Sequence, residues 1–373
     1  SWGVAVPGTS ERGNALGAAL GAVGGDYRLG LQVLTTATEA DMKQARALLD
    51  ANRVEISCDT SKEGVYIDAV VQSADASRVR TVISGSHSDI VLVQKNGDTI
   101  FETSKEPNGN TNFEHVPTLQ EALDYIESVP AEDIRFLLDG IRMNLDLAQD
   151  GLDHPFGLCS GRILKDSMEP GDWERPVARA RVLTCAASDA RMGGSLLPAM
   201  STVGSGNQGI TAILPVAVFA EHSQVGDERT SRALALSHLV TYLVKSRVGR
   251  ISSTCLCAIA SASGAAAAIT WLSNGNREMI AGSVKNVVSP LAGMICDGAK
   301  GACALKMGAA STEAFHAANL ALHGSAAGYY DGLATESMVS TLDNLSKLTT
   351  HTQKDVDIAI MEMLTEKETR QAE

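Results

Sequence analysis

The sequence predicts an α+β N-terminal domain with a largely antiparallel sheet, followed by an all-α, Ala/Gly-rich helical domain. Short strand-like runs alternate with helical signals up to about residue 130, whereas apolar residues recur every three or four positions after it. The length of 373 residues also exceeds what one hydrophobic core usually serves. We therefore expect two domains, residues 1–130 and residues 131–373.

The first half contains several strand signals. Asn96-Gly97-Asp98 is a strong hairpin signal between two of them. Thr38 is expected to cap a helix to about Asp50, and Thr118 with Glu121 has capping-box spacing for a helix to about Ser128. The predicted strands are 54–57, 65–72, 79–84, 90–94 and 99–102.

The second half is dominated by helical patterns. Ile134, Leu138, Ile141 and Leu145 form one apolar stripe on a helix that ends near Gly151. Residues 152–180 are proline-rich and predicted to be irregular. An aromatic content of only 4% and 34 glycines indicate helices that pack closely. The further predicted helices are about 208–222, 228–246, 254–273, 277–290, 311–323 and 335–365.

Bulk composition excludes several function classes. A net charge of −13 argues against nucleic-acid binding, which depends on clustered Lys and Arg. No apolar run reaches the roughly 20 residues that span a bilayer, and no polybasic run suggests a membrane surface. Seven scattered cysteines without a signal-peptide pattern favour free thiols in a reducing cytoplasm. We expect a cytoplasmic protein that forms a homo-oligomer.

A cysteine-bearing stretch from Gly293 to Lys306 is the strongest candidate for a metal centre. Cys296 and Cys303 are separated by six residues, and glycines between them let the backbone curl. With Cys255 or Cys257 from upstream, three thiolates would hold an iron–sulfur cluster that has one open iron. A zinc site completed by His238 or His316, or simply buried free thiols, are the alternatives.

Two polar, glycine-rich segments are candidates for substrate binding. Residues 187–194 are predicted to be a loop that offers Ser188 and Arg191. Residues 201–209 place backbone N–H groups, together with Ser205, Asn207 and Gln208, at the start of an apolar helix, where a carboxylate is favoured. An ordinary loop with a helix cap is the alternative.

His87 is the candidate catalytic acid or base, because it stands in a small polar loop between two predicted strands. A satisfied surface histidine is the competing interpretation.

Long motifs in the sequence resemble a known family. The stretches are VAVPGT, LLDGIRMNLDLAQDGL, SDARMGGSLLPAMSTVGSGNQGITAILPV followed by AEH, and GMICDGAKGACALK. They are similar to those of the L-cysteine desulfidase family and span nearly the whole chain. A more distant resemblance, carried by the cysteine-bearing helical part, is to the α chain of iron–sulfur L-serine dehydratases.

The resemblance implies a 4Fe-4S cluster held by Cys296, Cys303 and Cys255, with Cys257 as the rival for the third position. It implies a lyase of cysteine catabolism that eliminates the β substituent of a small L-amino acid, turning L-cysteine into sulfide, pyruvate and ammonia. An L-serine dehydratase and a non-catalytic amino-acid-binding relative are the alternatives.

One family motif has no counterpart in this sequence. Similar proteins carry a Gly-Cys-Thr-Glu-Pro segment ahead of the point where this chain begins, and its cysteine is a candidate catalytic residue. The resemblance therefore implies that a missing N-terminal segment or a companion chain supplies this residue.

Overall fold

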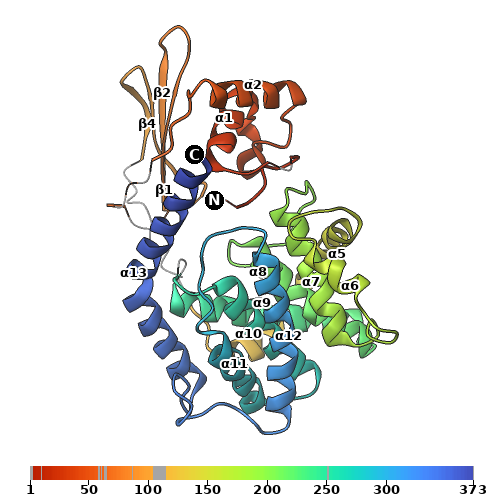
Figure 1. Ribbon diagram of the computed structural model, residues 1–373. Helices are drawn as coiled ribbons and strands as arrows, with labels where there is room; N and C mark the ends of the chain where they lie inside the picture. Colours follow the sequence, from red (N-terminus) through yellow and green to blue (C-terminus); the bar gives the residue numbers. More distant parts are fainter. Residues whose placement is uncertain are drawn as a thin grey trace. The chain divides into compact units, whose positions relative to one another are not determined.

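The computed structural model describes residues 3–9, 11–57, 59, 61–62, 65–85, 87–103, 115–249 and 252–372. It contains two compact units (Figure 1). The smaller unit is Val6–His115. The larger unit is Val116–Glu373 together with Ser1–Ala5.

The smaller unit begins with two helices that pack on each other. They are α1 (Asn14–Gly24) and α2 (Glu39–Asp50), with the short 3-10 helix η1 (Tyr27–Gln32) between them. Thr38 caps α2 as predicted, because its hydroxyl accepts from the N–H of Asp41. Leu16, Leu20 and Met42 are among the apolar residues buried between the helices.

The rest of this unit is a four-stranded antiparallel meander of order β1-β2-β3-β4. Asn96 and Gly97 join β3 to β4 with positive φ angles of 53° and 95°, as a type I′ hairpin turn requires. A predicted strand at 54–57 is wrong, because these residues pair with no strand and Val54 packs against the small helical core. The strands are β1 (Tyr66–Gln72), β2 (Arg78–Ser84), β3 (Ile90–Lys95) and β4 (Asp98–Glu102).

The larger unit is helical, so the predicted fold class is confirmed (Figure 1). Its first part contains α3 (Leu119–Ser128), α4 (Ala131–Ile134), α5 (Leu137–Asp153), α6 (Ser160–Asp166) and α7 (Pro176–Met192). Its second part contains α8 (Gly206–His222), α9 (Asp227–Val248), α10 (Leu256–Leu272), α11 (Arg277–Leu291), α12 (Cys303–Leu322) and α13 (Met338–Ala372). Helices α6 and α7 occupy much of the stretch 152–180, which was predicted to be irregular.

Helix α10 forms the centre of this unit and packs against α8, α9, α11 and α12. Nearly all of its side chains are small or aliphatic and buried. Gly264 lies so close to α9 that a methyl group in its place would sit 2.2 Å from the carbonyl oxygen of Ser237. The alanine- and glycine-rich composition therefore does allow close helix packing.

Within the part of the chain that the structure describes, no helix combines the length and apolar character needed to cross a membrane.

Candidate functional site

Backbone pairing brings two cysteine-bearing segments together. Thr254 and Ile295 form an isolated antiparallel bridge. Next to it, the N–H of Cys296 donates to the carbonyl of Ser253 at 2.8 Å, and the N–H of Cys255 donates to the carbonyl of Met294 at 2.6 Å. Cys255 and Cys296 therefore lie on neighbouring, oppositely directed segments, although 40 residues separate them in the chain.

Two further thiols join this pair. Cys303 is the first residue of α12, and its thiol lies 3.8 Å from the carbonyl of Gly298 in the preceding loop. Cys257 is in the first turn of α10, and its sulfur lies 3.1 Å from Oγ of Ser205. Burial raises the pKa of the Cys257 thiol, and the charges of Cys296 and Cys303 raise it further. Cys257 thus lies within electrostatic reach of Cys296 and Cys303, and Cys255 within reach of Cys257 and Cys296.

Three cationic side chains surround these thiols. Lys245 lowers the pKa of the Cys257 thiol. Burial lowers the pKa of the Arg191 guanidinium, and the nearby thiols Cys257 and Cys303 partly offset that effect. Lys306 bonds to the carbonyl of Ile295 at 2.7 Å and to Asp297. These cations favour anionic ligands, but they offset burial only in part, and the pKa values of the Cys257 and Cys255 thiols stay raised.

The donor atoms gathered at this site are thiol sulfurs. Among the described residues, no three His, Cys, Asp or Glu side chains are placed to hold one metal ion. An iron–sulfur cluster instead binds its thiolates on separate irons. Soft thiolates from three segments, with cations around them, fit such a group.

The N-terminus of α8 lies against Cys257. Ser205 is the N-cap, and its hydroxyl accepts from the N–H of Gln208 at 3.4 Å. The amide oxygen of Asn207 accepts from Arg191 at 3.3 Å, and that of Gln208 accepts from Lys245 at 3.0 Å. Because Arg and Lys only donate, these contacts fix which end of each amide faces its cation.

The two amides consequently direct their NH₂ groups away from the cations. Within the described residues, Nε2 of Gln208 is buried and has no hydrogen-bond partner. Buried amide donors are almost always paired, so this group needs an acceptor such as a carboxylate or a water molecule.

Ser188 and Arg191 lie near the end of α7, so the predicted loop at 187–194 is wrong for most of its length. The hydroxyl of Ser188 is buried and, within the described residues, unpartnered. Asp189, which lies between them on the helix, is buried and accepts three hydrogen bonds from the loop before α6 and the start of that helix: from N–H of Leu158 at 3.1 Å, Oγ of Ser160 at 2.7 Å and N–H of Gly161 at 3.0 Å.

That loop supports the cysteine-bearing stretch. Leu158 packs against Gly301, which lies between Cys296 and Cys303. Burial raises the pKa of the Asp189 carboxyl, whereas its three hydrogen bonds lower it. Asp189 is therefore a structural residue of the site that the sequence did not reveal.

His87 is exposed and lies in a turn between β2 and β3 of the smaller unit. The thiols belong to the other unit. Its predicted role as an acid or base stays a prediction.

Two residues on α9 are further functional candidates: Lys245 was missed from the sequence, and His238 was considered there as a possible zinc ligand. Lys245 and His238 are seven residues apart, which places them on one face of the helix. Nδ1 of His238 lies 2.7 Å from Oγ1 of Thr202, and its Nε2 is buried without a partner among the described residues. Burial lowers the pKa of His238 to about 4, so its ring is neutral at physiological pH. The seven-residue spacing of Lys245 and His238 within a helical pattern was the sequence signal that they share one face.

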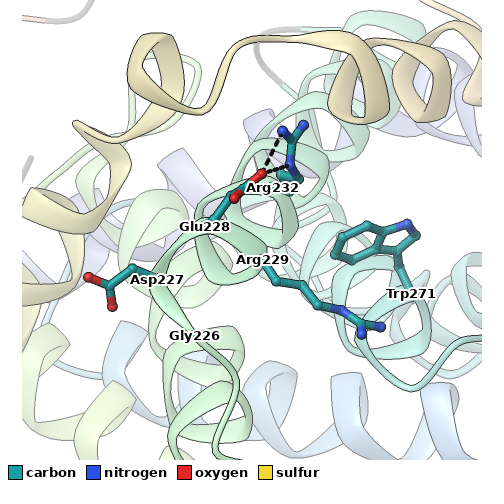
Figure 2. Close-up of a pocket in the computed structure, with 6 residues that line it drawn as sticks. All are labelled: Gly226, Asp227, Glu228, Arg229, Arg232 and Trp271. Atoms are coloured by element: carbon teal, nitrogen blue, oxygen red, sulfur yellow. Dashed lines mark hydrogen bonds and ion pairs between the residues drawn. The ribbon is translucent and has the colours of Figure 1, made fainter.

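A shallow pocket at the other end of α10 does not belong to this site (Figure 2). Arg229 lies over the ring of Trp271 there and bonds to the carbonyl of Leu272, and Arg232 pairs with Glu228. Arg229, Arg232 and Glu228 are thus already engaged. A 17-residue helix is about 25 Å long, so this pocket is remote from Cys255. Its lining residues are Gly226, Asp227, Glu228, Arg229, Arg232 and Trp271.

Comparison with known proteins identifies the family. The profile described as "Serine dehydratase alpha chain" matches residues 28–362. This chain belongs to that family, and the kinship with serine dehydratase-like and L-cysteine desulfidase proteins that the motifs indicated is confirmed.

Its relatives include bacterial proteins named UPF0597. One from Clostridioides difficile is 35% identical over 97% of this chain and 86% of its own length. One from Klebsiella pneumoniae is 38% identical over 96% of this chain and 85% of its own length. The UPF0597 protein YhaM of Shigella flexneri is 37% identical over 98% of this chain and 85% of its own length.

Proposed function

We propose that this chain is an iron–sulfur-dependent lyase that eliminates the β substituent of a small L-amino acid, with L-cysteine as the first choice of substrate and sulfide, pyruvate and ammonia as products. The observation that carries the proposal is the gathering of thiols from α10, the 294–302 loop and α12 beside the N-terminus of α8. Family membership supports a dehydratase-like lyase as the general class.

Cys296, Cys303 and Cys255 would hold a 4Fe-4S cluster, with Cys257 as the rival for the third position. When bound, this group supplies a Lewis-acidic iron for the departing heteroatom. One observation supports each rival: Cys255 flanks the backbone bridge, and Cys257 interacts electrostatically with Cys296 and Cys303.

The side chains of the chain itself would bind and orient the amino acid. Free N–H groups at the start of α8 and the NH₂ groups of Asn207 and Gln208 would donate to its carboxylate. Ser188 and Ser205 offer further hydroxyl groups, and Arg191 adds positive charge. His87, an N-terminal segment or a companion chain would take the Cα proton.

A dehydratase acting on L-serine is the second candidate, because the family is described by that activity. The two reactions share every residue named above and differ in whether sulfur or oxygen leaves. Side-by-side anaerobic assays of pyruvate release from L-cysteine and L-serine distinguish them.

The proposal is tested by iron analysis and turnover after anaerobic purification. Cys303→Ala should lose the brown colour, the iron and the release of pyruvate. Cys159→Ala, at a half-buried cysteine on the loop before α6, is the matched control and should keep all three. Iron at wild-type stoichiometry in Cys303→Ala would contradict the assignment, and comparison of Cys255→Ala with Cys257→Ala decides the third ligand.

A further inference from the structure

Lys245 is a buried cation that contacts two oxygen atoms at the start of α8. Its side chain on α9 is only 7% exposed. Its Nζ lies 2.9 Å from the carbonyl oxygen of Val203 and 3.0 Å from Oε1 of Gln208. Burying an ammonium group is costly unless it is hydrogen-bonded, and these two contacts are part of what holds it.

A second buried lysine, Lys285, makes contacts that are purely structural. Lys285 on α11 is 8% exposed, and its Nζ lies 3.2 Å from the carbonyl oxygens of Thr335 and Glu336. These contacts tie the segment before α13 to the helical core, and they involve backbone atoms alone. Lys245 differs because one of its acceptors is a side chain at the candidate site.

The contacts of Lys245 define the conformation of that site at two points. Val203 has a φ of 47°, which is unusual for a β-branched residue, and its carbonyl is held by Lys245. Gln208 is fully buried, and its oxygen is held by the same ammonium. The Nε2 of Gln208 is thereby turned away from Lys245, and it has no partner within the described residues.

We propose that Lys245 is a positioning residue for ligand binding. It orients the amide of Gln208 so that Nε2 donates to the carboxylate of a small L-amino acid, and it holds the turn that precedes α8. The choice of an amino acid as the ligand rests on the proposed function. The role of Lys245 in binding does not require turnover or iron.

Calorimetric binding of L-alanine to the anaerobically purified whole chain tests this proposal. L-Alanine has the amino and carboxylate groups of the substrates but no β leaving group. We expect Lys245→Met and Gln208→Leu each to weaken its binding at least tenfold, and the double variant to bind no more weakly than the weaker single variant, because both changes remove one donor. L-Alaninamide, which lacks the carboxylate, should bind equally weakly to wild type and variants.

Lys285→Met is the matched control, because it removes an equally buried ammonium elsewhere and should leave alanine affinity unchanged. Far-UV circular dichroism verifies folding, and if Lys245→Met does not fold, Gln208→Leu alone must show the tenfold loss. The proposal would be overturned if folded Lys245→Met bound alanine with wild-type affinity. It would also be overturned if the losses in the double variant were additive, or if the wild type did not bind alanine. A wild type that binds alanine but releases no pyruvate would refute the lyase and leave the role of Lys245 intact.

Discussion

Replacement of Asp189 by alanine should release the loop that supports the cysteine-bearing stretch. The carboxylate accepts from the N–H groups of Leu158 and Gly161 and from the hydroxyl of Ser160. Helix α6 has no side-chain cap of its own, so Asp189 satisfies donors at its N-terminus from outside the helix.

The magnitude follows from these three contacts. A hydrogen bond to a charged group contributes about 1.5–3 kcal/mol, so three at the lower value give about 4 to 5 kcal/mol. Burial of the carboxylate, which raises its pKa, offsets part of this gain. We therefore expect Asp189→Ala to lower the free energy of unfolding by about 3 kcal/mol, or the melting temperature by about 6–12 °C for a unit of this size. Asp189→Asn keeps one acceptor and should lose less.

Thermal unfolding followed by circular dichroism measures the global effect, and limited trypsin digestion at the exposed Arg162 reports the loop itself. Asp166→Asn is the control, because this carboxylate is exposed at the end of α6 and its loss should change stability by no more than about 0.5 kcal/mol. Equal melting temperatures and equal cleavage rates for Asp189→Ala and wild type would refute the capping role.

Two further predictions concern the helices beside the site. Burial lowers the pKa of folded His238 to about 4, below its unfolded value of about 6.5, so stability is full above pH 6.5 and falls by about 3 kcal/mol as the pH drops to 4. His238→Gln should remove this part of the pH dependence in urea titrations, and an unchanged profile would contradict the neutral buried ring. Gly209→Ala would place a methyl group 1.9 Å from the carbonyl oxygen of Met200, so misfolding or loss of alanine binding is expected. Gly17→Ala, with open space around it, should not destabilise, and equal melting temperatures for both variants would refute the close packing.

Local signals in the sequence were sufficient for much of the fold. The turn at Asn96-Gly97 needs two residues that tolerate positive φ, and that requirement is visible in the sequence itself. The capping box of Thr118 and Glu121 likewise depends on contacts three residues apart, and it forms as predicted. The predicted strand at 54–57 failed because its β-branched and polar residues alone do not supply a neighbouring strand.

The site was less predictable because its contacts are distant in sequence. The polar residues of 187–194 suggested a loop, but Asp189 is buried in a helix by partners about 30 residues away. Lys245 looked like an ordinary lysine near a helix end, and only its contacts with α8 reveal its position. The thiols of 296 and 303 were recognised from glycine spacing, and the bridge that brings them to α10 was not.

The Thr254–Ile295 bridge has a consequence for how the protein matures. Main-chain hydrogen bonds align the two segments, so we expect this alignment not to depend on a bound inorganic group. Small zinc domains behave in the opposite way, because they fold only when the metal binds. We expect a colourless preparation made in air to be natively folded and, under the proposed function, to take up an iron–sulfur cluster from ferrous iron and sulfide without a denaturation step. Loss of the proposed cluster to oxygen could then be reversed without refolding of the chain.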